Sequence, residues 1–252
     1  MKNIFLGLKF SFSYFSILPI NFRKEDDLSK KSIIKAMLFF FPFVGFILGV
    51  LTILSSDIFN SLGYLGYLMS AILYMGLYGF LHTEAILDVV DALYAKHSGK
   101  DAYKIIKEPT VGAMGILWGV SFVILKLAFI VSVLDTNLFY EFILIVIFSR
   151  LSLLININLF TAHSGSSFIN SMKESLSKRF ISVIFILYFV LGFIFVSFNI
   201  FLIVLSVVGS SIIISNYLKN KLGFLNGDVL GSSLEVSELI GMIVILVLMG
   251  SS

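Results

Sequence analysis

The chain contains 252 residues, of which 58% are apolar and only 13% are charged, and its formal net charge is +3. Soluble domains carry about a quarter charged residues, so this composition excludes a soluble globular enzyme and a disordered chain. The absence of cysteine excludes disulfides and thiolate metal sites, and the small net charge argues against nucleic-acid binding. The class that remains is a polytopic membrane protein.

The N-terminal segment, residues 1–19, is apolar and ends at Pro19. A spanning helix needs roughly 20 mainly apolar residues, so this segment predicts an interfacial or re-entrant helix instead of a span. The longer apolar segments that follow predict an all-α, polytopic integral membrane protein with a single transmembrane domain over residues 1–252. About seven spans are expected, over residues 33–56, 62–83, 113–134, 138–160, 180–198, 199–217 and 231–250.

Lysine and arginine lie on alternate connections between these spans. The connections that carry them cover residues 21–31, 92–112, 161–179 and 217–230. The opposite connections, near Asp57, Asp135 and Asn199, carry none, and the last of them requires a very tight turn. Because cytoplasmic loops are enriched in Lys and Arg, the N-terminus is predicted to be cytoplasmic and the C-terminus outside. We therefore expect a multi-pass protein of the cytoplasmic (inner) membrane.

Two groups of acidic residues stand at predicted cytoplasmic helix ends. Glu84, Asp88 and Asp91 have the spacing i, i+4, i+7, which places three carboxylates on one stripe of a helix. The second group, spaced i, i+7, i+10, comprises Asp228, Glu235 and Glu238. Carboxylates this close repel one another unless protons or a cation neutralise them, and hard oxygen ligands favour Mg²⁺, Mn²⁺ or Ca²⁺. The pattern predicts a phosphate-handling metal site that faces the cytoplasm.

Two other interpretations of these charges stay open. The acids also fit ordinary solvated helix ends, or an ion-coupled transporter whose acidic residues line a pathway near the bilayer midplane. Lys126 and Arg150 are the only charges predicted in mid-span. They fit counter-ions to the acids or phosphate anchors, and for Lys126 the alternative is a side chain that reaches back to the membrane surface.

Smaller signals lie close to the acidic groups. The stretch Lys107-Glu-Pro-Thr-Val-Gly-Ala-Met-Gly115 offers a cation, an acid and backbone amides at a helix N-terminus. The cation and the amides are typical phosphate-binding elements. His82 is placed to hydrogen-bond a ligand or to serve as a core histidine, and Gly231 permits the close approach of backbone or substrate.

Six motifs follow one another along nearly the whole chain. They are Phe15-Ser-Ile-Leu-Pro19, Phe41-Pro-Phe-Val-Gly45, Gly79-Phe-Leu-His-Thr-Glu-Ala-Ile-Leu-Asp-Val-Val-Asp91, the stretch from Lys107 to Gly115, Ser149-Arg150, and Gly227-Asp-Val-Leu-Gly-Ser-Ser-Leu-Glu-Val-Ser-Glu238. In order and spacing they resemble the motifs of the cobalamin-5′-phosphate synthases, also called adenosylcobinamide-GDP ribazoletransferases, which are related to the CDP-alcohol phosphotransferases. The chain departs from the family pattern where Glu84 and Glu108 replace aspartates, Ala85 and Ala92 replace glycines, and Ser232 replaces an alanine.

The resemblance implies a membrane phosphotransferase. A hydroxyl of α-ribazole, or of its 5′-phosphate, would attack the phosphorus nearest cobinamide in adenosylcobinamide-GDP, and GMP would leave. One or two Mg²⁺ ions, or Mn²⁺, would bridge the pyrophosphate. The metal ligands implied are Glu84, Asp88, Asp91, Asp228, Glu235 and Glu238, with Asp91 and Asp228 as catalytic residues. The substrate-binding residues implied are His82, Lys107, Glu108, Gly112, Gly115, Arg150, Gly227 and Gly231.

The partners implied are the two substrates and the lipid bilayer, and a homo-oligomer is left open. A lipid-type CDP-alcohol phosphotransferase is the related alternative, but the chain lacks that family's Asp-Gly-x-x-Ala-Arg run. A cation-coupled transporter is the alternative from another class. Uptake by sealed vesicles without release of GMP would favour it.

Overall fold

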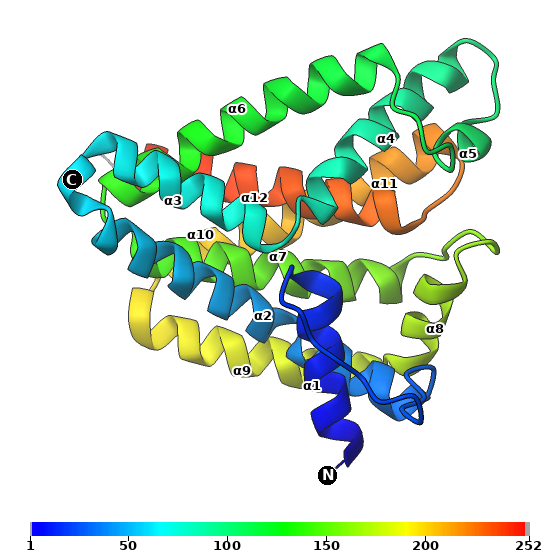
Figure 1. Cartoon of the computed structure of the whole chain (residues 1–252), viewed down its shortest axis with the longest axis horizontal. Helices are drawn as coiled ribbons and strands as arrows, with labels where there is room; N and C mark the ends of the chain where they lie inside the picture. Colours follow the sequence, from blue (N-terminus) through cyan, green and yellow to red (C-terminus); the bar gives the residue numbers. More distant parts are fainter. Residues whose placement is uncertain (1, 250–252) are drawn as a thin grey trace.

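The computed structural model describes residues 2–249, and within this range the chain forms helices and no strand (Figure 1). In chain order the helices are α1 (Lys2–Phe15), α2 (Lys31–Ile58), the 3₁₀ turn η1 (Asn60–Leu62), α3 (Tyr64–Leu77), α4 (Leu81–His97), α5 (Ala102–Ile105), α6 (Ala113–Asp135), α7 (Phe139–Leu159), α8 (Ser167–Ser175), α9 (Lys178–Val196), α10 (Asn199–Val204), the π-helical turn η2 (Leu205–Gly209), α11 (Ser210–Leu222) and α12 (Gly227–Met249).

The helical membrane architecture predicted from the apolar segments is confirmed. Six helical segments are long and apolar enough to cross a membrane, and the bent pair α3 and α4 makes a seventh if it is counted as one span. The tight turn expected near Asn199 is also present, because α9 ends at Val196 and α10 begins at Asn199, with Ser197 at φ 50° between them.

The predicted second span, residues 62–83, needs correction. α3 ends at Leu77 and α4 begins at Leu81, and the two helix axes differ in direction by 77°. Gly79 and Phe80 between them have φ 66° and 54°, a left-handed conformation that glycine adopts without steric cost. Glu84, Asp88 and Asp91 therefore lie on a separate helix, α4, and not at the end of one straight spanning helix.

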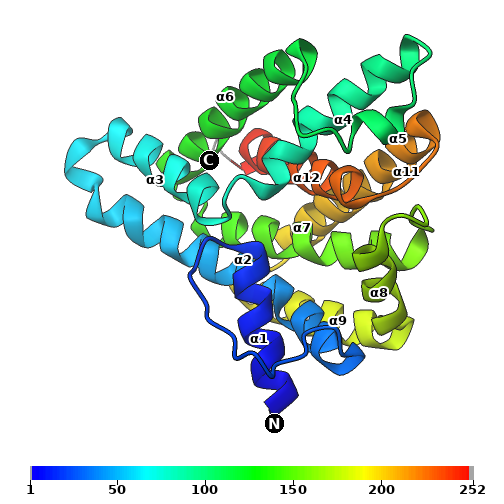
Figure 2. The ribbon, with the colours of Figure 1, turned by 45° about the vertical axis from the view of Figure 1, so that its right-hand side comes forward.

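Helix α1 lies across the neighbouring helices instead of beside them (Figure 2). Its 14 residues are about 21 Å long, too short to cross the hydrocarbon core. Gly7 permits close packing on α2, since a Cβ there would lie 2.3 Å from the Ala36 side chain. At the other end of α1, the Phe15 ring stacks on Phe41 at a centroid distance of 3.8 Å. This contact joins the first two sequence motifs.

Helices α7 and α12 form the centre of the bundle. Both are buried along most of their length, whereas α6 and α9 expose most of theirs. The basic connections after α1, α4 and α7 and the basic last turn of α11 lie at one end of the bundle, which we call the basic end (Figure 1). The turns after α2, α6 and α9 lie at the other end. Helix α12 thus begins at the basic end with Asp228, and its later acids, Glu235 and Glu238, lie further along the helix toward the middle of the bundle.

Candidate functional site

Four carboxylates gather at the basic end, and we call Glu84, Asp88, Asp91 and Asp228 the acidic cluster. Asp88 is half-buried and lies close enough to the other three to be repelled by each of them. Lys107 attracts Asp88, and its ammonium lies 3.7 Å from the carboxylate of Asp228. The structure thus brings together, from three separate segments, four of the six acids predicted to bind metal and the predicted phosphate-binding lysine.

Asp91 has a specific local task within the acidic cluster. One carboxylate oxygen accepts the N–H of Gly112 at 2.5 Å, and the other accepts the N–H of Gly115 at 2.8 Å. Gly112 precedes the first residue of α6 and has no side chain to cap that helix, so Asp91 supplies the cap from α4. The two amides were predicted to bind a substrate phosphate, but in the structure a carboxylate of the chain itself occupies them.

The glycines of this stretch are required by the approach of Asp91. A Cβ on Gly115 would lie 2.4 Å from the Asp91 carboxylate and 2.8 Å from the Leu87 carbonyl. We expect Gly115→Ala to lower the free energy of unfolding by about 1–3 kcal/mol, because overpacked contacts must shift. Unfolding of the detergent-solubilised protein measures the loss. Gly76→Ala is the matched control, since a Cβ there meets no atom within 4 Å, and an equal loss in both variants would refute this explanation.

His82 and Asp228 line a cavity of about 110 Å³ between α4 and α12. His82 is buried, and Gly231 packs against it at the predicted close approach, where a Cβ would lie 3.4 Å from its Nδ1 atom. Tyr14 from α1 also lines the cavity. Burial, followed by the nearby charge of Asp228, raises the pKa of the Tyr14 hydroxyl, so this group stays protonated and can donate a hydrogen bond.

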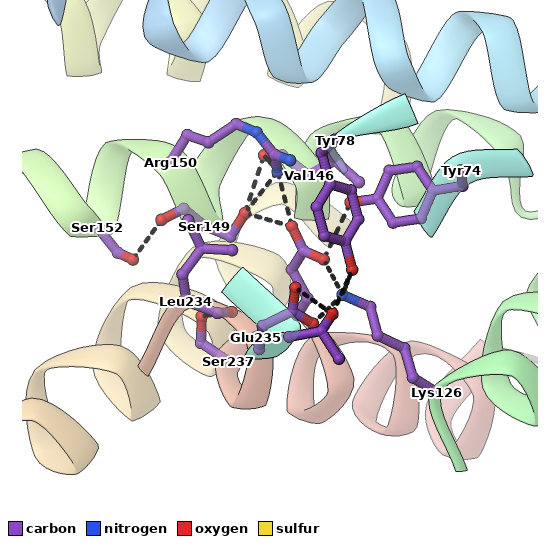
Figure 3. Close-up of polar contacts among 12 residues, drawn as sticks. Tyr74, Tyr78, Lys126, Val146, Ser149, Arg150, Ser152, Leu234, Glu235 and Ser237 are labelled. Carbon is purple, nitrogen blue, oxygen red and sulfur yellow. Dashed lines mark hydrogen bonds and ion pairs between the residues drawn. The ribbon is translucent and has the colours of Figure 1, made fainter. Parts of the chain in front are cut away.

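The predicted deep cations lie in a second site, shown in Figure 3, which we call the buried ion-pair cluster. It comprises Lys126, Arg150, Glu235 and Glu238. The Lys126 ammonium donates to Glu235 and, at 2.8 Å, to Glu238. Arg150 donates to the other oxygen of Glu238 at 2.7 Å. Two cations thus neutralise two carboxylates between α6, α7 and α12.

Hydroxyl groups complete the buried ion-pair cluster. Tyr74 donates to Glu238 at 3.0 Å, Ser149 donates to Glu238 at 2.8 Å, and Thr83 donates to Glu235 at 3.3 Å. The sequence predicted no role for these three residues, although Thr83 and Ser149 lie within two of the six motifs. Tyr74 lies in an apolar helix and carries no charge. The signal that could have identified it is its spacing of one helical turn from Tyr78, which places two hydroxyl groups on the same side of the segment.

The placement of Glu235 and Glu238 corrects the prediction that all six acids lie at cytoplasmic helix ends. α12 begins at Gly227, so a rise of about 1.5 Å per residue places Glu238 roughly 15 Å deeper than Asp228. Lys126 does not reach to the membrane surface either, because its side chain is fully buried against these acids. The counter-ion interpretation of Lys126 and Arg150 therefore describes the structure.

Arg150 also explains a glycine in the second motif. A Cβ on Gly45 would lie 2.6 Å from the Arg150 side chain and 2.9 Å from the carbonyl of Val146. The glycine therefore lets α2 pass over the guanidinium group. Of the remaining predicted residues, Glu108 is exposed and forms no ion pair within the described chain, and Gly227 faces open space.

The fit of the acidic cluster to a metal ion is limited by geometry. Within residues 2–249, no three His, Asp or Glu side chains converge in an arrangement ready to hold an ion. Because Asp91 caps α6, the carboxylates left for a cation are Glu84, Asp88 and Asp228. These are hard oxygen donors, which suit Mg²⁺ bound partly by substrate phosphates and water. The chemistry of these donors suits such an open site, although their spacing in this structure does not form one.

Comparisons with known proteins agree along nearly the whole chain. The family whose model matches is described as Cobalamin-5-phosphate synthase, and the match covers residues 7–246. The adenosylcobinamide-GDP ribazoletransferase of Clostridium perfringens strain SM101 is 26% identical over 252 residues, which cover 97% of this chain and 99% of the relative. Proteins of the same name from Thermodesulfovibrio yellowstonii and Clostridioides difficile are 27% and 28% identical, covering 92% and 98% of both chains. No solved structure matches the chain.

Proposed function

The chain belongs to the cobalamin-5-phosphate synthase family, and from this membership we propose its function: it is a membrane phosphotransferase that acts on adenosylcobinamide-GDP in the last steps of cobalamin biosynthesis. The family match over residues 7–246 carries this conclusion. The second substrate is α-ribazole or its 5′-phosphate. The hydroxyl oxygen of this substrate forms a bond to the phosphorus next to cobinamide, and the bond between that phosphorus and GMP breaks. The hydroxyl proton passes to a carboxylate.

The acidic cluster is the place we assign to this chemistry. Phosphoryl transfer depends on positioning and on neutralising phosphate charge. Glu84 and Asp88 would hold Mg²⁺ or Mn²⁺, which when bound would stabilise charge on the leaving phosphate. Lys107 binds a phosphate oxygen from its place beside Asp228. Asp228, which lies at the cavity, accepts the proton. We assign a structural role to Arg150, Glu235 and Glu238, because all three form buried ion pairs within the bundle.

The basic end is the side we assign to the cytoplasm. Its connections hold nearly all the lysines and arginines that lie outside the spans, and the opposite turns hold none. From the positive-inside rule we infer that the acidic cluster faces the cytoplasm at the inner membrane. GDP-activated substrates and Mg²⁺ would reach the site there without crossing the bilayer.

Release of GMP tests the proposed function. Membranes containing the protein, supplied with adenosylcobinamide-GDP, α-ribazole 5′-phosphate and Mg²⁺, should form GMP and the joined corrinoid in equal amounts. Excess EDTA should abolish the reaction, and added Mg²⁺ or Mn²⁺ should restore it, because carboxylates alone repel the pyrophosphate. Membranes without the protein are the control. Uptake of a corrinoid into sealed vesicles with no GMP release would instead support a transporter.

A further inference from the structure

The cavity beside Asp228 has an apolar floor and a polar rim. Its rim includes the exposed Tyr14 and the partly exposed Asp228, and the phosphate chemistry is assigned next to Asp228. Its floor is formed by buried side chains from the five helices α1, α4, α7, α8 and α12. They are Phe15, His82, Ala85, Leu153, Met172 and Leu230. Apart from His82 this floor is apolar.

His82 is the one floor residue with unused hydrogen-bonding capacity. Its side chain is 6% exposed. Within residues 2–249 no hydrogen bond joins either ring nitrogen to another residue, and neither nitrogen is a completely buried atom without a partner, so the imidazole keeps an edge open to the cavity. The imidazole lies between Tyr78, at a centroid distance of 6.1 Å, and Phe15, at 6.3 Å. Because buried polar groups normally have a partner, an unpartnered imidazole that lines a cavity indicates a ligand atom placed to meet it.

The lining selects among the chemical groups of the two substrates. A phosphate needs cations, and no cationic side chain lines the cavity. Guanine presents several polar groups that would lose hydrogen bonds against an apolar floor. The corrin ring is far too large for about 110 Å³. A benzimidazole is a flat, mainly apolar bicyclic ring with few polar atoms, so its edge fits the floor and one nitrogen can meet His82.

We propose that this cavity binds the benzimidazole base of α-ribazole, with His82 as its hydrogen-bonding partner and Ala85 as the residue that sets the room for ring substituents. The inference rests on the proposed function and names the subsite of the acceptor substrate. With the base in the cavity, the attached ribose lies at the rim next to Asp228. The ribose hydroxyl can then pass its proton to the Asp228 carboxylate. The base thereby positions the attacking oxygen.

The position of Ala85 is fixed from the α12 side. Ser232 donates a hydrogen bond to the Ala85 carbonyl at 2.8 Å, and a Cβ on Gly231 would lie 3.0 Å from the Ala85 methyl group. Moving α4 and α12 apart to make room for a larger side chain at position 85 would break the hydrogen bond from Ser232. Because Ala85 also lines the cavity, we expect the added methyl groups of a larger side chain to reduce the room there.

Base selectivity tests the proposal. For Ala85→Val we expect kcat/KM with 5,6-dimethylbenzimidazole ribazole phosphate to fall about tenfold more than with the unsubstituted benzimidazole compound, since a misfitting methyl group is worth about this much. The KM for adenosylcobinamide-GDP should stay unchanged. Ala71→Val is the matched control, because Ala71 is equally buried on α3 and lies outside the cavity. It should leave the base preference as in the unmodified protein.

A second variant keeps the test decisive if Ala85→Val does not fold. His82→Phe retains an aromatic ring but removes the hydrogen bond, and should raise the KM for α-ribazole phosphate about tenfold with little change in the KM for adenosylcobinamide-GDP. An unmodified protein that releases no GMP would contradict the proposed function itself. An active protein whose variants change only the KM for adenosylcobinamide-GDP, or neither KM nor base preference, would overturn the base subsite alone.

Discussion

Replacing Asp88 with asparagine is expected to lower the rate of GMP release by about a thousandfold, because it removes a central charge of the acidic cluster. Asp88 lies within reach of Glu84, Asp91, Asp228 and Lys107, so it contacts whatever cation or phosphate enters the cluster. Asparagine has nearly the same shape, and the fold should therefore be retained. Initial rates at saturating substrate, together with a melting curve in detergent, measure both effects.

The control for Asp88→Asn is Asp57→Asn. Asp57 is an exposed acid near the end of α2, at the opposite end of the bundle, and its loss should change the rate by less than twofold, the range of an ordinary surface substitution. Near-normal GMP release by Asp88→Asn at all Mg²⁺ concentrations would show that the acidic cluster is not the reaction centre. A large loss that excess Mg²⁺ partly restores would support a metal ligand.

Replacing Lys126 with methionine is expected to lower the free energy of unfolding by about 3–5 kcal/mol, the usual result of removing one partner of a buried ion pair. The ammonium of Lys126 is fully buried between Glu235 and Glu238. Arg150 can neutralise only one of these two acids, so a carboxylate charge would be left without a partner inside the bundle. Denaturant unfolding in detergent micelles measures the difference from the unmodified protein.

A second substitution separates charge from packing at this position. Glu235→Gln in the Lys126→Met background removes the orphaned charge, and most of the lost stability should return. Lys104→Met, at an exposed lysine outside the spans, is the control and should alter stability by no more than about 0.5 kcal/mol. If the double variant were as unstable as Lys126→Met, the ion pairs would not be the source of the stabilisation.

The sequence alone predicts the spans because the information is local. Apolar runs of sufficient length must be helices in a bilayer, and the spacing of Glu84, Asp88 and Asp91 fixes their common stripe on α4. The break at Gly79 was missed because a left-handed glycine leaves no trace in hydropathy. Local patterns therefore predicted six of the spans and one face of the site. They did not predict the bend between α3 and α4, on which the seventh span depends.

Partners from distant segments account for what the sequence did not reveal. Asp91 is 24 residues from Gly115, and no local rule indicates that its carboxylate would occupy amides that look free in the motif. Glu235 and Glu238 were expected at a helix end because the last span was predicted to begin at residue 231, although α12 begins at Gly227. Their pairing with Lys126 and Arg150 depends on how α6, α7 and α12 pack.

The buried ion-pair cluster also constrains how the chain is made. Lys126 and Arg150 precede their carboxylate partners by 109 and 88 residues, so at about 5–20 residues per second each waits roughly 5–20 s during synthesis before its partner emerges from the ribosome. A lone cation in mid-bilayer costs several kcal/mol over that interval. We therefore expect the packing of α6 and α7 to be completed only when α12 enters the membrane and supplies both carboxylates.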